Sequence, residues 1–400
     1  MDVEEAGTIG FALWRVRDER RKSLRAIAGL AGMSKDTLNR IERGLLSPTL
    51  SQLNALADAL QVSVSELTRL PVPAPANGQT DSAIKAVFLA LMEVSRDRPG
   101  GQVLPVEVLR RLVETIQGAH YSCGKDHEVG ATLPGLIRDL HTSIVAGRDV
   151  AQLLDQAVLL HAGATIGWLR VAGAPIEMRV LAAELAFRAA EHRDTPEARG
   201  LALWGGLHVM VTAGAVDLAR GELAAVSVGT GSPESMQLAG MLALSHSFLA
   251  AVDNRPGDLD APLEYATELA ARTGEGNAYW MGFGPTNVGF WRLHTALAAG
   301  DPQLAVAIAE GLRPEVHPFR GCQAMYWVDY GQALARLRGR HDDAVTALRR
   351  AELISPRRVL RDPITRDVVA MLLRTSRRTS PTDQELQGMA LRAGLPGVPQ

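Results

Sequence analysis

The chain has 400 residues, which is enough for two or three domains, and its 46% hydrophobic and 22% charged residues are ordinary for a globular protein. Its net charge of −2 excludes a basic surface over the whole molecule, so binding of nucleic acid would need a local patch. Two cysteines, Cys123 and Cys322, exclude a disulfide framework and indicate a reducing compartment. The start of the chain, with Asp2, Glu4 and Glu5, is unlike a signal peptide, and we identify no run of about 18 apolar residues. We therefore expect a cytoplasmic protein without a membrane span.

The first 70 residues predict five short helices. Ser23 and Ser34 each precede an apolar segment of helical spacing, as an N-cap does. Gly32 allows a tight turn between these two segments, because glycine tolerates a positive φ. Gly44 ends the second of them, and Pro48 prevents its continuation. A helix, a glycine-containing turn and a second helix at this spacing are typical of a helix-turn-helix.

The second helix, in the segment SKDTLNRIERG at 34–44, carries the residues expected to read DNA. A helix-turn-helix presents the start of this helix to the major groove. Asn can pair with adenine, and Arg or Lys with guanine. The expected contacts with bases are Ser34, Lys35, Asp36, Thr37, Asn39 and Arg40.

Local charge supports this interpretation. Residues 15–43 contain nine basic and four acidic side chains, a balance of +5 in a chain whose net charge is −2. Such a patch displaces counterions from phosphates and so provides affinity that is independent of sequence. A basic, water-facing helix surface without a partner is the alternative, and the order of the motifs argues against it.

Residues 23–67 closely resemble the helix-turn-helix of the XRE family, the type found in Cro and phage repressors. The similarity rests on Ile27-Ala28, Gly32-Met33-Ser34, Ile41-Glu42-Arg43-Gly44, Pro48-Thr49, Leu53, Leu56-Ala57, Leu60 and Val64. The resemblance implies a buried Glu42 and a helix closed by Gly44. One departure is Leu24, where the family often has a glutamine that touches the DNA backbone; phosphate anchoring would then fall to Ser23, Arg25 and Arg43. It also implies a homodimer on a pseudo-palindromic double-stranded operator.

The segment PVPAPANGQT at 71–80 predicts a linker, because alternating prolines stay extended. Residues 81–400 then predict helix after helix with short Gly, Pro and Asp breaks, and the whole chain is expected to be all-α. Ala344, Leu348, Ala351 and Pro356 follow the spacing of the second helix of a tetratricopeptide repeat, and 300–312 is a weaker copy. We predict a tetratricopeptide-like α-solenoid over 81–400 that binds an effector and mediates dimerisation.

One later segment, 279–301, suggests where an effector would bind. It contains five of the eighteen aromatic residues and resembles a segment that recurs in actinobacterial regulators of this architecture. Aromatic residues at helical spacing also fill cores, so a purely structural role is the alternative. A pocket for a small molecule or a peptide would be lined by Trp280, Phe283, Thr286, Asn287, Trp291, His294, Arg320, Gln323, Tyr326 and Trp327.

We identify no catalytic motif and expect no enzyme, no metal and no cofactor. The segment CGKDH, 123–127, is the one local grouping of Cys, Asp and His. It would indicate an enzyme only if a ligand or a metal ion bound there. The expected function is that of a transcriptional regulator. The alternative is a tetratricopeptide-type interaction scaffold that the DNA-binding module merely localises.

Overall fold

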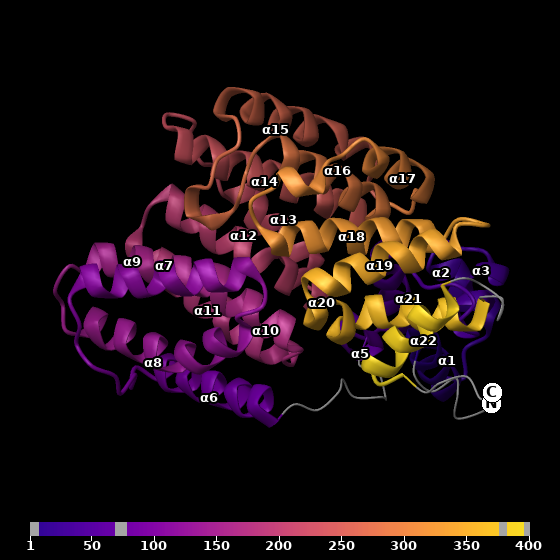
Figure 1. The fold of residues 1–400 in the computed structure, drawn as a ribbon, viewed down its shortest axis with the longest axis horizontal. Helices are drawn as coiled ribbons and strands as arrows, with labels where there is room; N and C mark the ends of the chain where they lie inside the picture. The colour runs from indigo at the N-terminus through magenta and orange to yellow at the C-terminus, as the bar shows by residue number, and fades with distance from the viewer. Residues whose placement is uncertain (1–7, 69–77, 376–381, 396–400) are drawn as a thin grey trace.

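The computed structural model describes residues 8–68, 78–375 and 382–395, and within these ranges its regular secondary structure is helical, without strands. The predicted fold class is therefore confirmed: an N-terminal helix-turn-helix domain is followed by a long helical region, which we define as residues 78–395 (Figure 1). The predicted linker, 71–80, lies mostly outside the described residues. Its last three residues belong to the next helix, which begins at Gly78 rather than at 81.

The DNA-binding domain contains five helices around a small apolar core. These are α1 (Ile9–Glu19), α2 (Leu24–Leu30), α3 (Lys35–Glu42), α4 (Leu50–Leu60) and α5 (Val64–Thr68). Leu38 and Ile41 of α3 are fully buried against α1 and α2. The turn between α2 and α3 passes through Gly32 at φ +64°, and Gly44 at φ +64° ends α3. Both glycines therefore occupy the left-handed region that their sequence positions predict.

The helical region is a succession of packed helices. They are α6 (Gly78–Ser95), α7 (Val106–Ser122), α8 (Asp126–Val145), α9 (Val150–Leu159), α10 (Ile166–Ala172), α11 (Ile176–Arg193), α12 (Pro196–Ala213), α13 (Val216–Ala225), α14 (Pro233–Val252), α15 (Asp260–Thr273), α16 (Pro285–Ala298), α17 (Pro302–Glu310), α18 (Arg320–Ala335), α19 (His341–Ile354), α20 (Pro356–Arg361), α21 (Pro363–Thr375) and α22 (Asp383–Arg392). Consecutive helices pack as pairs, for example α18 with α19. In that pair Ala344, Leu348 and Ala351 are fully buried, and the absent side chain of Gly331 makes room for Leu348. Small residues here allow the two helices to approach closely.

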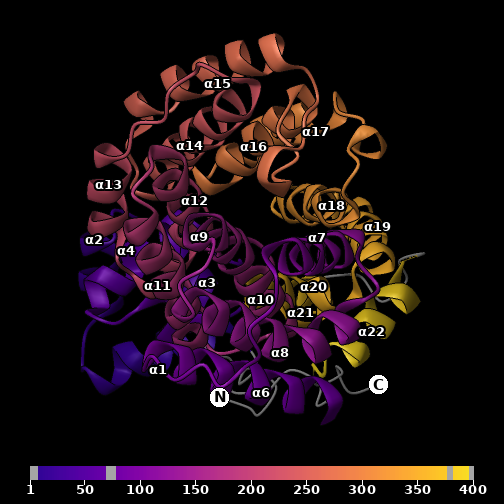
Figure 2. The same ribbon diagram turned by 90° about the vertical axis from the view of Figure 1, so that its left-hand side faces the viewer.

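The helical region curves until its late helices meet its early ones. Figure 2 shows α13 to α18 following an arc that ends beside α7. At this junction the ring of Tyr121, from α7, stacks on Phe319 with 4.8 Å between the ring centres. The Arg361 guanidinium donates a hydrogen bond to the carbonyl of Ala172 at the end of α10. Contacts between residues so far apart in sequence close the region around its own interior.

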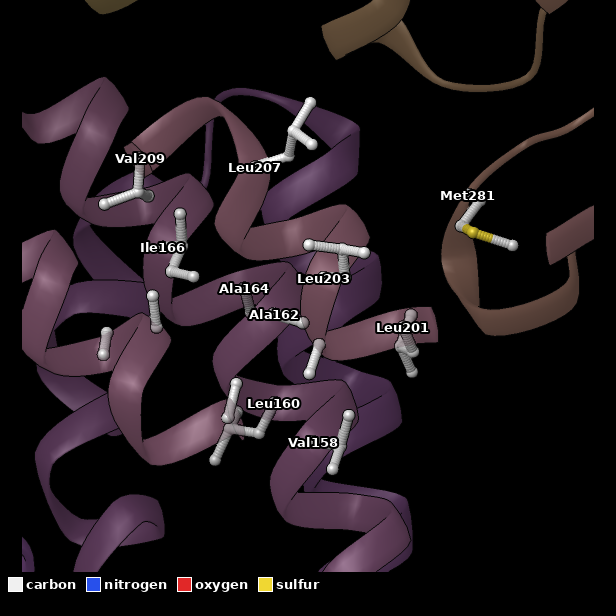
Figure 3. Packing of buried hydrophobic residues seen from close by; sticks show 14 of the residues in the cluster. Val158, Leu160, Ala162, Ala164, Ile166, Leu201, Leu203, Leu207, Val209 and Met281 are labelled. Carbon is white, nitrogen blue, oxygen red and sulfur yellow. The ribbon is translucent and has the colours of Figure 1, made fainter. Parts of the chain in front are cut away.

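One helix in this interior is irregular. The sequence predicts a single helix over 149–171, but the structure divides it into α9, a π-helical turn at Leu160–Thr165 and α10. A π-turn adds a residue to the helical repeat and is frequent at functional sites. Figure 3 shows Ala162 and Ala164 of this turn next to Leu203 of α12, and Gly205 lies directly against Ala162. The turn rotates the following residues of α10, including Arg170, relative to α9.

Helix α14 is both long and apolar. By length and composition alone, Pro233–Val252 could cross a membrane, but 83% of its apolar window is buried inside the protein. Phe248 and Leu244 are fully buried within the helical region. A central core helix passes the same test of length and hydropathy, so packing explains its composition.

The DNA-binding domain is docked onto the helical region. The Ile9 amide donates to Asp367 Oδ1 of α21 at 2.9 Å, and Arg336 Nη2 of α18 donates to the Pro48 carbonyl at 3.1 Å. Helices α4 and α5 contact α14 and α12. Ile364 joins the core of the small domain, whereas Leu50 packs against the core of the helical region. The two parts therefore share apolar surface as well as hydrogen bonds.

Candidate functional site

Helix α3 projects the predicted DNA-reading residues away from this docking surface. Its packing partners are α1 and α2, and it lies at the edge of the molecule in Figure 1. The side chains of Lys35, Asp36 and Arg40 are exposed, whereas Thr37 and Asn39 are half-buried. Ser34 caps the helix: its Oγ accepts from the Thr37 amide at 3.0 Å and lies 2.8 Å from Thr37 Oγ1. These two hydroxyls hold the helix start in the geometry that a groove-binding helix needs.

The basic residues near α3 fall into two groups. Arg17 makes a bidentate ion pair with the buried Glu42, at 2.6 and 2.7 Å. Arg20 donates to the Leu60 and Gln61 carbonyls. By contrast, the exposed side chains of four other residues have no hydrogen-bond or ion-pair partner within the described ranges; they are Arg25, Lys35, Arg40 and Arg43. Unpaired cations on one exposed surface provide the phosphate-binding character that the sequence predicts.

A cavity of about 420 Å³ lies between the helices of the helical region and the DNA-binding domain, and it is partly open to solvent. Its apolar wall comes from several helices and includes Trp204, Phe248, Phe290, Trp291 and Tyr326. The DNA-binding domain contributes a further part of the wall through Pro48, Thr49, Leu50, Val64 and Thr68. A cavity of this size with mostly apolar walls and a few polar groups is typical of a small-molecule site. We call it the central cavity.

The polar groups of the central cavity are predominantly cationic. Five arginines and two aspartates line it, a formal balance of +3: Arg170, Arg179, Arg336, Arg358, Arg361, Asp329 and Asp362. The side chain of Arg170 is accessible to the solvent of the cavity although protein surrounds it. Three histidines, His120, His208 and His294, also line it, and His294 Nδ1 lies 2.9 Å from Asp329 Oδ2.

Burial changes the pKa of several histidines and arginines that line the cavity. Burial lowers the pKa of His120 to about 3, and the charge of Arg358 adds to this effect. Burial, assisted by the charge of Arg170, lowers the pKa of His208 well below its usual value. Both histidines are therefore neutral near pH 7. Burial also lowers the pKa of Arg179 and Arg336 to about 10, which still leaves their guanidinium groups charged at that pH.

Four of the predicted effector residues meet at the central cavity, from α16 and α18. Asn287, Trp291, His294 and Tyr326 all line it. Asn287 Nδ2 donates to the Met281 carbonyl at 3.3 Å, and Tyr326 Oη donates to the Ala309 carbonyl at 2.9 Å. These hydrogen bonds fix both side chains at the wall.

The other six predicted effector residues lie elsewhere. Phe283 is fully buried in the core against Gly240, and Trp280 stacks on Tyr121 and Phe319 at the junction of early and late helices. The Thr286 amide donates to Glu275, and Gln323 donates to the His317 carbonyl. Arg320 is exposed. Trp327 stacks under Arg350 at 4.7 Å and lines a separate, open depression of about 340 Å³.

Sequence reasoning missed the cationic half of the cavity. Arg170, Arg179 and Arg358 are spread over almost 190 residues of sequence, and no motif connects them. The one available signal was the glycine pair Gly163 and Gly167 in the irregular helix. These glycines leave space for Gln117 and His120 of α7.

The segment 123–127 has a structural explanation. The Asp126 carbonyl accepts from Trp168 Nε1 at 2.7 Å, and its carboxylate lies 4.0 Å from Arg357. Burial raises the pKa of the Cys123 thiol, which makes it a weaker nucleophile. Within the described ranges, no group of three or more His, Cys, Asp or Glu side chains could hold a metal ion.

Comparison with known proteins identifies the first domain. Residues 9–70 match the family model of a helix-turn-helix domain. Neither a curated protein nor a solved structure matches the chain. The first domain is therefore a helix-turn-helix DNA-binding domain, and it is attached to a long helical region.

Proposed function

We propose that the chain is a sequence-specific transcriptional regulator whose helical region senses a small molecule or peptide in the central cavity. The observation that carries this proposal is the shared wall: Leu50 of α4 and Thr68 of α5 line the same cavity as Trp291 of α16. A ligand there contacts the DNA-binding domain and the helical region simultaneously. The proposed role is regulatory rather than catalytic, in the cytoplasm and on the nucleoid.

The shared wall gives a physical route for regulation. Pro48 and Thr49 lie between α3 and the start of α4, and Arg336 holds the Pro48 carbonyl from the helical region. A ligand that displaces these residues changes how firmly the DNA-binding domain is docked. The ligand can change the affinity for DNA only if it binds the docked and the undocked states of the domain with different affinities.

We assign the DNA-binding domain to the XRE type and the helical region to the tetratricopeptide-like solenoids, of the kind found in actinobacterial regulators. The buried Glu42 and the positive φ of Gly44 support the first assignment. The fully buried Ala305, Ala309 and Ala344 at helix pairs support the second. A homodimer would set two α3 helices about 34 Å apart on a pseudo-palindromic operator. Light scattering of the protein with and without operator DNA measures this stoichiometry.

The regulatory step is tested by filling the cavity. An operator is first selected from random duplex DNA with the full-length chain. Its affinity is then measured with and without a deproteinised extract of the host cells. Met325 lines the cavity, so Met325→Trp should abolish the response to the extract while leaving DNA binding without extract intact. Leu353→Trp is the matched control, because Leu353 is 64% exposed on α19. An unchanged response in Met325→Trp would rule out the cavity as the sensing site.

A further inference from the structure

Three arginines of the central cavity lack the partners that enclosed charges normally have. Arg170 is on α10, Arg179 on α11 and Arg358 on α20. All three line the cavity, and none of their guanidinium groups makes a hydrogen bond or ion pair with another described residue. Nε of both Arg179 and Arg358 is fully buried without an acceptor. We call these residues the arginine cluster.

The members of the arginine cluster repel one another. After burial, the charge of Arg358 is the largest cause of the lowered pKa of Arg170, and the charge of Arg170 acts in the same way on Arg179. Nearby carboxylates compensate only in part: Asp362 and Asp329 act on Arg170, and Asp362 and Glu177 act on Arg179. Asp362 Oδ2 already accepts from the amide and hydroxyl of Thr365, at 2.9 and 2.7 Å. Guanidinium groups that are buried without partners are unfavourable, and a bound anion would supply the missing partner.

The surroundings of the cluster define the rest of the ligand. The cavity has aromatic walls, formed by Trp204, Phe248, Phe290 and Trp291. Inorganic phosphate alone would not cover these walls and would leave them in contact with water. Guanidinium groups match planar carboxylate and tetrahedral phosphate oxygens through paired hydrogen bonds. Duplex DNA cannot supply the anion, because a double helix is far too wide to enter a cavity of about 420 Å³.

We propose that the arginine cluster is the anion-binding end of the central cavity and that its ligand is an amphipathic organic anion, with a carboxylate or phosphate group on an apolar body. The proposal rests on the proposed sensing function and specifies its ligand class. It also assigns roles to three residues outside the sequence-predicted site. The anion neutralises the cluster, and the aromatic walls cover the apolar body.

A matched pair of fluorescent probes tests the charge requirement on the full-length chain. 8-Anilinonaphthalene-1-sulfonate is an aromatic anion, and N-phenyl-1-naphthylamine is the same ring system without the sulfonate. We expect Arg170→Gln and Arg358→Gln each to weaken binding of the anionic probe about tenfold or more, because each removes charge-assisted hydrogen bonds. Binding of the neutral probe should change by less than about twofold, since the apolar walls are unaltered.

Two control variants separate charge from shape. Arg313→Gln removes an exposed arginine outside the cavity and should leave both probes unaffected. Arg358→Lys keeps a cation and should retain more affinity for the anionic probe than Arg358→Gln does. Equal binding of the anionic probe to the parent and both glutamine variants would overturn the proposal. So would a parallel loss of both probes in Arg358→Gln and Arg358→Lys, because the arginine would then act on cavity shape alone.

Stability provides an independent readout that does not require a ligand. Removing one of several unpaired, mutually repelling charges should stabilise the empty protein, so Arg170→Gln should raise its melting temperature. Arg313→Gln should leave that temperature unchanged. A lower melting temperature in Arg170→Gln would mean that its charge is compensated within the protein, which contradicts an anion site.

Competition distinguishes the two anion sources. We expect 1-naphthoate or 1-naphthyl phosphate to displace the anionic probe, and the better competitor identifies carboxylate or phosphate as the preferred group. The neutral 1-naphthalenemethanol should not displace it at the same concentration; if it does so equally well, the proposal is wrong. Measuring the affinity for operator DNA with each competitor separates the hypothesis of an anion site from the hypothesis of regulation through the cavity. Arginine-dependent binding without any change in operator affinity would refute regulation through the cavity and leave the anion site standing.

Discussion

Among the described residues, the arginines without a side-chain partner near α3 and those in the cavity wall differ in their surroundings. Arg25, Arg40 and Arg43 of the DNA-binding domain are exposed, and water solvates an exposed cation at little cost. Arg179 and Arg358 lie in the cavity wall with a fully buried Nε, where an unpaired cation is unfavourable. The exposed set suits a large polyanion that approaches from outside. The enclosed set suits one small anion, so the same residue type indicates two different partners.

Lowering the pH should produce the largest difference in stability between the helical region and the DNA-binding domain. All ten histidines lie in the helical region, and residues 1–70 contain none. Burial lowers the pKa of His141 to about 4 and that of His161 well below 6.5, and their Nε2 atoms lie 2.9 Å apart. Below about pH 6.5 the unfolded chain takes up protons that the folded chain excludes. Stability of the helical region should therefore fall between pH 6.5 and 4, by about 1.4 kcal/mol per pH unit for each such histidine.

Hydrogen exchange resolved by peptide, corrected for the intrinsic effect of pH, measures this difference at pH 7 and pH 5. Protection should fall in the helical region by more than in α1 to α5. His141→Gln should flatten the pH dependence of the helical region, whereas His192→Gln, at an exposed position, should not. Equal loss of protection in both regions would show that docking, rather than histidine burial, controls their stability.

Breaking the Arg17–Glu42 ion pair of the DNA-binding domain should have the next largest effect on stability. Glu42 is 7% exposed and forms the bidentate pair with Arg17. Glu42→Ala leaves a nearly buried cation unpaired, which should destabilise α1 to α5 by about 3 kcal/mol. Protection of the α1 and α3 amides in the full-length chain measures the loss. Glu19→Ala removes the partner of an exposed pair at 3.8 Å and should cost less than about 1 kcal/mol. If the two variants lose equal protection, the Arg17–Glu42 pair has no special structural role.

Substitutions on the DNA-reading surface of α3 should lower the specificity of DNA binding. Asn39→Ala and Arg40→Ala should each reduce discrimination between the operator and unrelated DNA by about 1–3 kcal/mol, because each removes a contact with a base. Competition binding with both DNAs measures this difference. Arg98→Ala, at an exposed position in the helical region, is the control. Parent-like discrimination in both α3 variants would exclude α3 as the reading helix.

The sequence predicted local features well and distant groupings poorly. Caps and glycine turns depend on neighbours within a few residues, so Ser34, Gly32 and Gly44 have the conformations expected of them. The π-turn at Leu160–Thr165 could not be predicted from helical periodicity, because it depends on packing against α7 and α12. Arg170 and Arg358 meet only because the helical region closes on itself. The aromatic half of the cavity was partly predictable because α16 and α18 concentrate aromatic residues locally.

The smallest expected effect concerns phosphate contacts, and it sharpens the contrast between the two arginine sets. Arg25→Ala and Arg43→Ala should weaken binding to all DNA sequences alike. Each should reduce the slope of log affinity against log salt concentration by about 0.9, since one phosphate contact is lost. Arg170→Gln is the matched control: it removes an arginine that is enclosed in the cavity, so the slope should be that of the parent. A changed slope in Arg170→Gln would mean that the cavity arginines also contribute to DNA binding, so that the two sets of arginines would not have separate partners.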